Sequence, residues 1–394
     1  MLFTIIGIPD TLQKTPPPEA SESIRNGKVF SGGRRHHELV AGILPEDAVW
    51  IDITVPLTDV FCQYSKYQEV VVFASGDPLF FGFANTLRRE FPEAKITLYP
   101  YFNSLQTLAH RLLLPYHDMR IVSLTGRPWH ELDRVLIEGA EKIGVLTDGK
   151  HTPSAIARRM TEYGFTEYEM TVGEHLGNPE LENITHTTLA EASRKDFTQP
   201  NCLILEGTHR RRWGIPDSEF THLPGRPRMM TKMPIRLLSL QALELTECRT
   251  LWDIGFCTGS VSIEAKLQFP HLNIVAFEIR PECKDIMAEN MRKFSAPGID
   301  VVMGDFIEAD LASLPSPDAV FIGGHGSRLA AIMQRVAATL KPGGTIVMNS
   351  VSKESKDLFI QSCAESGLEF DETPFRISLN DYNPIEILRC RKSL

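Results

Sequence analysis

Residues 250–265 read TLWDIGFCTGSVSIEA, and this stretch decides the fold of the C-terminal half. An apolar strand ends at Asp253, a tight turn follows on Gly255 and Gly259, and the chain then continues as a helix. A second apolar strand, residues 273–277, ends on Glu278. A strand, a glycine turn, a helix and a second strand that ends on an acidic residue are typical of a βαβ unit that binds a nucleoside.

The glycine spacing favours one nucleoside cofactor over another. Glycine lets a ligand approach main-chain N–H groups because no Cβ intrudes. The pattern is Asp-x-Gly-x-x-x-Gly, whereas a dinucleotide pyrophosphate is cradled by Gly-x-Gly-x-x-Gly. We therefore expect S-adenosylmethionine, which carries no phosphate, and no NAD. The alternative is a turn that needs glycine only for close contacts within the protein. The expected cofactor-binding residues of this half are Asp253, Gly255, Thr258 and Gly259 in the turn, Glu278 for the ribose and Asp305, after the third strand, for adenine.

Length and composition set the class of protein. A chain of 394 residues is too long for one ordinary core and suits two domains. No uninterrupted apolar run is long enough to span a bilayer, so we expect no membrane association. Seven cysteines, an odd number without a CxxC pair, favour reduced thiols in a cytoplasm and no metal site.

The charge distribution bears on the partners. A net charge of −9 argues against nucleic acid. A short basic segment, residues 208–232, separates the expected domains 1–207 and 233–394. It suits a polyanionic small molecule, with Arg228 and Lys232 as candidate substrate-binding residues, although a solvated linker fits the same composition.

Both halves alternate strands and helices, which predicts an α/β protein. In the second half, strands near 250–253, 273–277, 300–303, 319–322 and 345–349 predict a doubly wound, Rossmann-like sheet of seven strands, ending in an antiparallel pair near 370–380 and 384–390. In the first half, strands near 2–8, 49–52, 70–74 and 95–99 form one set, and strands near 120–124, 142–146, 166–172 and 202–206 form another. Two lobes around a cleft follow, with a helix over 103–113 between them.

The loop after the fourth strand of the second half should face the methyl acceptor, because ligands of this fold bind beyond the carboxyl ends of the strands. It reads Gly323-Gly324-His325-Gly326, without the Asn-Pro-Pro-aromatic sequence that is common in enzymes that methylate amino nitrogens. The glycines leave room for a large flat substrate. His325 could orient a substrate carboxylate, and a histidine in a solvent-facing turn is the alternative.

The first half carries two further motifs. Residues 71–80, VVFASGDPLF, run from a β-branched strand into a Ser-Gly-Asp-Pro turn. Residues 31–37, SGGRRHH, place Arg34 and Arg35 behind two glycines. Forked guanidinium donors suit carboxylates, so both arginines are candidate substrate-binding residues, against an alternative of exposed charge at a helix start.

Taken in order, GGRRHHEL, ASGDPLFFG, SLTGRPW and LTDGKHTPSAIA resemble the corrin and porphyrin methylase family, in the branch that acts on precorrin-6Y. The second half, from MTKMPIR through FEIRPE and DAVFIGGHG, resembles decarboxylating methyltransferases that act on the same macrocycle. The resemblance implies a two-lobed tetrapyrrole methylase domain with a second set of cofactor-binding residues: Ser75, Gly76, Asp77, Leu79 and Ser104. It also implies methylation of two meso carbons of precorrin-6Y, or its cobalt form, with loss of carbon dioxide from an acetate side chain, in cobalamin biosynthesis. A homo-oligomer is expected.

Two departures from the family pattern concern the first half. The first strand ends in Gly7-Ile8-Pro9-Asp10 where the family has several glycines, and a proline-rich stretch, 15–19, follows. Tyr101 stands where the family has glycine. We therefore expect the N-terminal site to bind the cofactor less tightly. The alternatives are a methyltransferase for RNA or for another small molecule, and a tetrapyrrole-binding protein with an inactive N-terminal site.

Overall fold

The computed structural model describes residues 1–9, 18–226, 228–371, 375–378 and 384–394. Asp10 and most of the proline-rich stretch lie outside the described residues. The chain divides into two compact units. The N-terminal unit holds residues 1–127, 141–158 and 168–207, and the C-terminal unit holds 128–140, 159–167 and 208–394. Within the described part, no helix has the length and apolar character needed to cross a bilayer.

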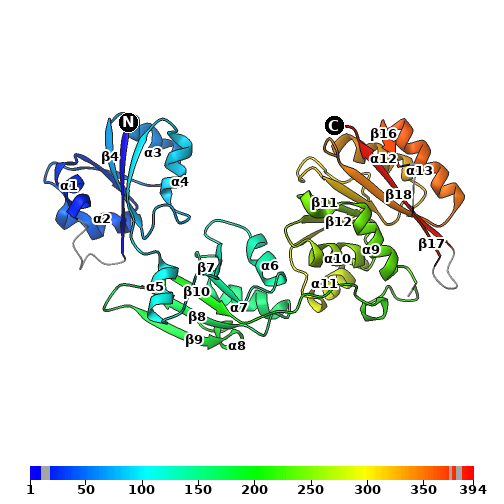
Figure 1. The fold of residues 1–394 in the computed structure, drawn as a ribbon, viewed down its shortest axis with the longest axis horizontal. Helices are drawn as coiled ribbons and strands as arrows, with labels where there is room; N and C mark the ends of the chain where they lie inside the picture. The colour runs from blue at the N-terminus through cyan, green and yellow to red at the C-terminus, as the bar shows by residue number, and fades with distance from the viewer. Residues whose placement is uncertain (10–17, 227, 372–374, 379–383) are drawn as a thin grey trace. The chain divides into compact units, whose positions relative to one another are not determined.

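The first lobe of the N-terminal unit is built on a parallel sheet in the order β3-β2-β4-β1-β5 (Figure 1). Strand β2 was not predicted, because two of its four residues, Ser31 and Gly32, are typical of a turn. It matters because its end leads directly into Arg34 and Arg35. The elements are β1 (Leu2–Ile8), α1 (Pro18–Asn26), β2 (Val29–Gly32), α2 (Arg34–Val40), β3 (Val49–Asp52), α3 (Leu57–Tyr64), β4 (Glu69–Ser75), α4 (Phe83–Glu90) and β5 (Lys95–Tyr99).

The second lobe has a mixed sheet in the order β6-β7-β10-β8-β9. The edge strand β9, NITHTT, was not predicted because it is polar, as edge strands often are. The predicted strand over 166–172 begins later, at Glu169. The elements from 104 to 206, of which α6 and the end of α7 fall in the C-terminal unit, are α5 (Ser104–Arg111), β6 (Arg120–Ser123), α6 (His130–Ile137), β7 (Lys142–Leu146), α7 (Pro153–Glu162), β8 (Glu169–Glu174), β9 (Asn183–Thr188), α8 (Leu189–Ala192) and β10 (Asn201–Glu206).

The C-terminal unit has a sheet of eight strands among the described residues, in the order β13-β12-β11-β14-β15-β18-β16, with β17 also paired to β18. The predicted doubly wound fold is confirmed. The one strand predicted over 370–380 is instead two short strands on either side of 372–374, and 379–380 lie outside the described residues. The elements are α9 (Met233–Ala242), β11 (Thr250–Ile254), α10 (Ser260–Gln268), β12 (Asn273–Glu278), α11 (Cys283–Lys293), β13 (Ile299–Met303), β14 (Ala319–Ile322), α12 (Leu329–Thr339), β15 (Thr345–Ser350), α13 (Lys353–Glu365), β16 (Leu368–Phe370), β17 (Phe375–Ile377) and β18 (Ile385–Lys392).

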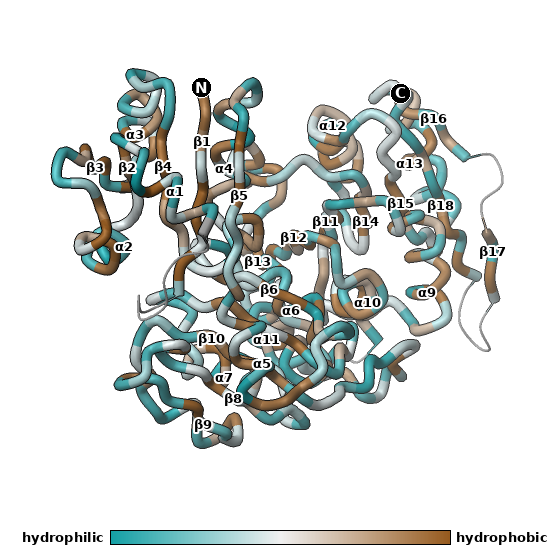
Figure 2. Tube along the Cα trace, turned by 60° about the vertical axis from the view of Figure 1, so that its left-hand side comes forward, coloured by the Kyte–Doolittle hydropathy of each residue, from teal (hydrophilic) through white to brown (hydrophobic). Residues whose placement is uncertain are grey.

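Hydrophobic residues gather along strands such as β10 and β12, while the connecting loops are mostly hydrophilic (Figure 2). In the C-terminal unit, Trp252, Phe277 and Phe306 meet edge to face beneath the sheet. The strand order reverses between β11 and β14, and ligands of open α/β sheets bind at such a point. The carboxyl ends of these parallel strands therefore bring Asp253, Glu278 and the loop after β14 to one edge.

The connecting segment, residues 208–232, is built into the C-terminal unit along much of its length. The main-chain N–H groups of Gly214 and Ile215 donate to the Glu264 carboxylate, at 2.7 and 3.2 Å. Arg236 is fully buried, pairs with Glu264 at 3.1 Å and donates to the carbonyls of Ile215 and Thr231. Arg236 is thus a structural cation, and it does not add to the exposed basic charge of this region.

Candidate active sites

The cofactor loop, residues 253–259, has a left-handed backbone at Gly255 and Gly259, with φ of +79° and +75°. A Cβ on Gly255 would lie 2.9 Å from the main-chain N and O of Gly324, and one on Gly259 would lie 1.9 Å from Met287 Sδ. Both glycines are therefore required by neighbouring parts of the protein. Cys257 also has a positive φ, +52°, where glycine would carry no strain.

Glu278 lies under this loop at the end of β12 and is 2 % exposed. Its carboxylate accepts hydrogen bonds from the main-chain N–H groups of Cys257, Ile279 and Arg280, at 2.9, 2.9 and 3.0 Å. The Arg280 guanidinium lies 3.2 Å away. A carboxylate has about four acceptor positions, so ribose hydroxyls would share Glu278 with these donors. The sequence predicted the acid at this place but not its partners.

Asp253 is buried at the end of β11, at 1 % exposure. Its Oδ2 accepts a hydrogen bond from Ser262 Oγ at 2.5 Å. Its Oδ1, like Thr258 Oγ1, is buried and has no hydrogen-bond partner among the described residues. Burial raises the pKa of Asp253 to about 7. A buried, unpaired acceptor costs free energy, so this oxygen beside the loop fits an amino group of a ligand.

Asp305 follows β13 as expected, but its carboxylate already accepts hydrogen bonds from other residues of the chain. It accepts hydrogen bonds from the Ile307 N–H at 3.1 Å and from Arg328 Nη1 at 2.5 Å. The hydrogen bond from Arg328 holds the pKa of Asp305 below its ordinary value. An adenine amine would therefore compete with Arg328, whose side chain is 47 % exposed.

The loop after β14 adjoins the cofactor loop, and that it faces the methyl acceptor stays a prediction. The Gly323 N–H donates to the carbonyl of Ile254 at 2.8 Å, and a Cβ on Gly324 would meet open space. His325 Nε2 lies 3.5 Å from Ser355 Oγ, and its Nδ1 is buried without a partner in the described part of the chain. Burial lowers the pKa of His325, so this side chain is neutral near pH 7.

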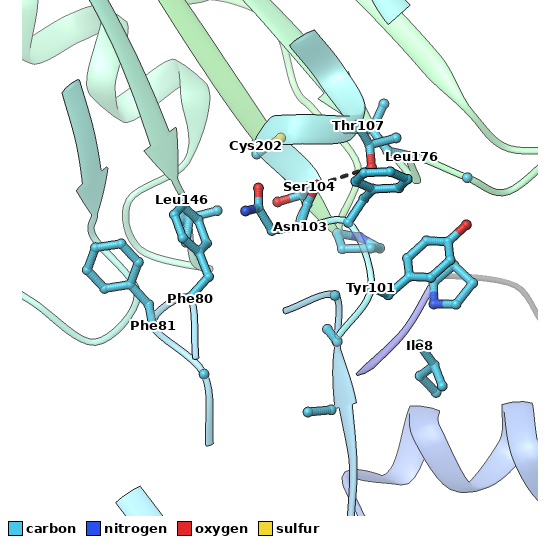
Figure 3. A pocket seen from close by; sticks show the side chains of 18 of the residues that line it. Ile8, Phe80, Phe81, Tyr101, Asn103, Ser104, Thr107, Leu146, Leu176 and Cys202 are labelled. Atoms are coloured by element: carbon cyan, nitrogen blue, oxygen red, sulfur yellow. Dashed lines mark hydrogen bonds between the residues drawn. The ribbon is translucent and has the colours of Figure 1, made fainter. Parts of the chain in front are cut away.

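The N-terminal unit contains a cavity of about 1120 Å³ in which motifs from both lobes meet (Figure 3). Ser75 joins two of them: Arg35 Nη2 donates to Ser75 Oγ at 2.9 Å, and His36 Nε2 lies 2.9 Å from the same atom. The Gly33 N–H donates to His36 Nδ1 at 3.2 Å, which leaves Nε2 as the donor to Ser75. Burial and the charge of Arg35 lower the pKa of His36 to about 4, so the imidazole is neutral.

Tyr101 lines one wall of this cavity, and its main chain lies close to Gly7. A Cβ on Gly7 would lie 1.9 Å from the Gly76 carbonyl oxygen and 2.8 Å from the Tyr101 nitrogen, so glycine is required there. The Tyr101 N–H donates to the same carbonyl at 3.2 Å. Figure 3 shows the Tyr101 ring near Ile8, across the pocket from the ring of Phe80. Tyr101 therefore occupies space at the cavity wall that glycine would leave open.

The other predicted residues of this half divide into two groups. Ser75, Gly76, Ser104 and Arg35 line the cavity. Asp77 and Leu79 do not; Asp77 Oδ1 instead accepts from the Leu79 N–H at 2.9 Å and shapes the turn. Arg34 does not line the cavity; its side chain is 92 % exposed and pairs with Glu38 one helical turn away, so its part in substrate binding stays a prediction.

Two arginines that the sequence analysis missed also line the cavity. Arg111 pairs with Glu182 at 2.6 Å, and Arg127 donates to Ser123 Oγ at 2.7 Å. Among the described lining residues Glu182 is the only acid, against Arg35, Arg111 and Arg127. The cavity is therefore electropositive. Arg111 ends helix α5 and Arg127 lies in a loop, and neither belongs to a periodic pattern, so the sequence contained little to single them out.

The candidates of the connecting segment lie in the C-terminal unit. Arg228 is exposed, and the neighbouring Met229 carbonyl accepts a hydrogen bond from Cys257 Sγ of the cofactor loop at 3.0 Å. Lys232 Nζ lies 3.8 Å from Asp217. Arg228 is thus a charge close to the cofactor loop, whereas Lys232 has an acidic neighbour of its own.

Comparisons with known proteins match the two halves of the chain to two families. Residues 19–193 match the family described as Tetrapyrrole (Corrin/Porphyrin) Methylases, and residues 225–389 match the Precorrin methyltransferase domain. A Sinorhizobium protein named precorrin-6Y C(5,15)-methyltransferase [decarboxylating] is 32% identical over 93% of this chain and 88% of its own length. A Mycobacterium tuberculosis protein of the same name is 30% identical over 76% of this chain and 74% of its own.

Shorter relatives match one part of the chain. A Salmonella typhimurium protein named cobalt-precorrin-6B C(15)-methyltransferase (decarboxylating) is 34% identical over 41% of this chain and 89% of its own length. The solved C-terminal domain of a precorrin-6Y C5,15-methyltransferase from Rhodobacter capsulatus is 32% identical, with a TM-score of 0.37 over 47% of this chain and 100% of that chain.

Proposed function

Since the chain belongs to the family of decarboxylating precorrin-6Y C(5,15)-methyltransferases, enzymes of cobalamin biosynthesis, we propose that its two units divide the two methylations of the tetrapyrrole between them. The N-terminal unit methylates C5 of precorrin-6Y or its cobalt form. The C-terminal unit methylates C15 and releases carbon dioxide from an acetate side chain. This division is supported by the two family matches and by the name of the shorter Salmonella relative.

Each unit is proposed to hold S-adenosylmethionine. When bound, this cofactor would supply an electrophilic methyl group on a sulfonium, whose sulfur takes the bonding electron pair and leaves as a neutral thioether. The fit in the C-terminal unit is supported by the unpaired Oδ1 of Asp253, which suits the cofactor's amino group. Glu278 would hold the ribose and Asp305 the adenine. In the N-terminal unit, Ser75 already receives hydrogen bonds from Arg35 and His36, so its own hydroxyl proton is free to donate to a ligand.

The chain's own residues contribute to catalysis mainly by positioning the cofactor and the tetrapyrrole and by excluding water from them. The carbon to be methylated is enamine-like and already nucleophilic, so little acid–base help is needed. Holding two reacting atoms about 3–3.5 Å apart in line can supply several kcal/mol. Gly324 leaves space for the flat substrate beside the cofactor loop. Neutral His325 can donate a hydrogen bond that orients a substrate carboxylate, and Arg228 can attract another carboxylate.

The observation that carries the proposal is the electropositive cavity of the N-terminal unit. Its volume of about 1120 Å³ and its three arginines suit a macrocycle with several carboxylates. An RNA methyltransferase would not need this cavity, and a net charge of −9 opposes RNA binding.

The test is to supply the purified full chain with precorrin-6Y, or its cobalt form, and S-adenosylmethionine, and to weigh the products. Two added methyl groups with loss of one carbon dioxide are expected. Unchanged substrate in both forms would contradict the proposal. A product with one methyl group and loss of carbon dioxide would mean that the N-terminal unit binds the tetrapyrrole without methylating it.

A further inference from the structure

We propose that Phe81 and Arg127 form a substrate clasp in the N-terminal cavity, in which Phe81 provides a stacking face for the tetrapyrrole and Arg127 binds one of its peripheral carboxylates. The two residues come from different lobes of the unit, and both line the cavity. The identity of the ligand rests on the proposed function; the clasp itself rests on the geometry described below.

The backbone of Phe81 is held in a strained conformation. Its φ is +54°, in the left-handed region, where a bulky residue is strained. Its side chain is 45 % exposed, so burial of the ring recovers only part of that cost. Strained residues of this kind persist where the surrounding structure fixes them, and they cluster at ligand clamps.

The turn around Phe81 is fixed from both sides. The Phe80 N–H donates to the Asp77 carbonyl at 3.0 Å, and Asn85 Nδ2 donates to the Leu79 carbonyl at 2.9 Å. A Cβ on Gly82 would lie 2.4 Å from the Pro78 carbonyl oxygen, so the chain passes close to itself there. The Phe81 ring is therefore presented by a constrained turn, and the Phe80 ring meets it edge to face at 5.2 Å.

Arg127 reaches the Phe81 ring from the other lobe, with its Cζ 5.2 Å from the ring centroid. Its Nη1 donates to Ser123 Oγ at 2.7 Å and to the Thr125 carbonyl at 3.4 Å. Its Nε and Nη2 have no acceptor among the described residues, and no described carboxylate lies within ion-pair distance. Arg111, by contrast, is paired with Glu182. Arg127 thus keeps the two donors that bind a carboxylate side-on.

The pair matches the chemistry of the substrate. A conjugated macrocycle needs an apolar face to stack on, and its carboxylates need forked donors. The cation–π contact holds the guanidinium in place without using Nε or Nη2. Figure 3 shows the Phe80 and Phe81 rings across the pocket from Tyr101, so aromatic rings lie on two sides of the space that a flat ligand would enter.

The test measures C5 methylation by the full chain, counted as methyl groups added at that carbon, and compares KM for the tetrapyrrole in Arg127→Gln, Phe81→Leu and the parent. Arg127→Gln should raise KM by about fivefold to tenfold and flatten its salt dependence, because a charged hydrogen-bonding partner is lost. Phe81→Leu should raise KM by about threefold without changing the salt slope. Affinity for S-adenosylmethionine should stay the same in both.

Two matched controls separate binding from folding. Arg89→Gln removes an exposed arginine on α4 that does not line the cavity. Leu113→Gly relieves the same backbone strain at a 90 % exposed residue with φ of +52° outside the cavity. Neither should change KM. Phe81→Gly relieves the same strain but loses the ring's contacts with Phe80 and Arg127, so it should stabilise the fold less than Leu113→Gly and raise KM like Phe81→Leu.

The outcomes distinguish the two proposals. If the parent methylates the tetrapyrrole and KM is unchanged in both Arg127→Gln and Phe81→Leu, the clasp is wrong and the proposed function stands. A loss of cofactor affinity as large as the change in KM would show a structural role and would also overturn the clasp. If the parent forms no product, the proposed function fails, and absorbance titration of the tetrapyrrole against the same variants still tests the clasp.

Discussion

The buried acid at the end of β11 leads to a prediction at the scale of one residue. Burial raises the pKa of Asp253 to about 7, above its ordinary value. Between about pH 4 and pH 7 the unfolded state is ionised while the folded state holds a proton, so stability falls as the pH rises through this range. Asp253→Asn should remove this dependence and should be the more stable protein at pH 8, by up to about 4 kcal/mol. Urea unfolding of the parent and the variant at pH 5 and pH 8 measures this difference in the free energy of unfolding.

The same substitution should weaken cofactor binding, because the unpaired Oδ1 is the proposed partner of an amino group. We expect the KM for S-adenosylmethionine in the decarboxylating reaction to rise about tenfold or more. A parent-like KM in this variant would show that Asp253 does not bind the cofactor. Parent-like stability at both pH values would show that the carboxyl titrates normally.

A second prediction concerns the Glu278 carboxylate and the Arg280 guanidinium that pairs with it. Glu278→Gln keeps most contacts to the loop but loses the charge, so the KM for S-adenosylmethionine in carbon dioxide release should rise about tenfold. Arg280→Ala removes a competing donor from the same carboxylate and should leave that KM unchanged or lower it. Should both variants raise KM equally, the ion pair and not the free carboxylate would be the binding element, and the ribose assignment would be wrong.

Among the elements, buried hydrogen bonds and an ion pair join the connecting segment and α9 to α10, and we expect them to contribute strongly to the stability of the C-terminal unit. Arg236 and Glu264 are both fully buried, and Glu264 also accepts from the main chain of Gly214 and Ile215. Glu264→Gln breaks the closer of the two ion pairs of the buried Arg236 guanidinium and leaves only Asp217, at 3.4 Å. Breaking a buried ion pair typically costs about 3–5 kcal/mol, and Asp217 should keep the loss near the lower end of that range. Denaturant unfolding should show this loss. The exposed pair of Arg34 and Glu38 is the control, since Glu38→Gln should change stability by less than about 1 kcal/mol.

The elements also show what the sequence could and could not predict. Strands β1, β3, β5 and β7 have the predicted bounds, because runs rich in β-branched, aromatic and other apolar residues lie between turn residues. Strands β2 and β9 were missed, because Ser31 and Gly32 at the end of β2 are typical of a turn and β9 is a polar edge strand. Motif residues were found by spacing, but their partners were not. Arg280 on Glu278, Arg328 on Asp305 and Arg127 on Phe81 are loop arginines, and no periodicity marks them.

At the scale of the whole molecule, the chain should bind two equivalents of S-adenosylmethionine with unequal affinity. The C-terminal unit offers buried acids beside a glycine loop, whereas Tyr101 narrows the N-terminal cavity. Calorimetry of the full chain should therefore resolve a tighter and a weaker site. Glu278→Gln should weaken the tighter one and leave the other unchanged.

Tyr101→Gly decides whether crowding is the reason for the weaker site. The Tyr101 main chain already bonds to Gly76, so glycine can keep that contact while its missing side chain opens the wall. Affinity at the weaker site should then rise about threefold to tenfold, with the tighter site unchanged, because added space beside the main chain permits closer approach. Tyr101→Phe, which keeps the ring, serves as the control and should behave like the parent. If glycine weakens the site instead, the tyrosine ring is a binding surface for the ligand, and the order of the two affinities must have another cause.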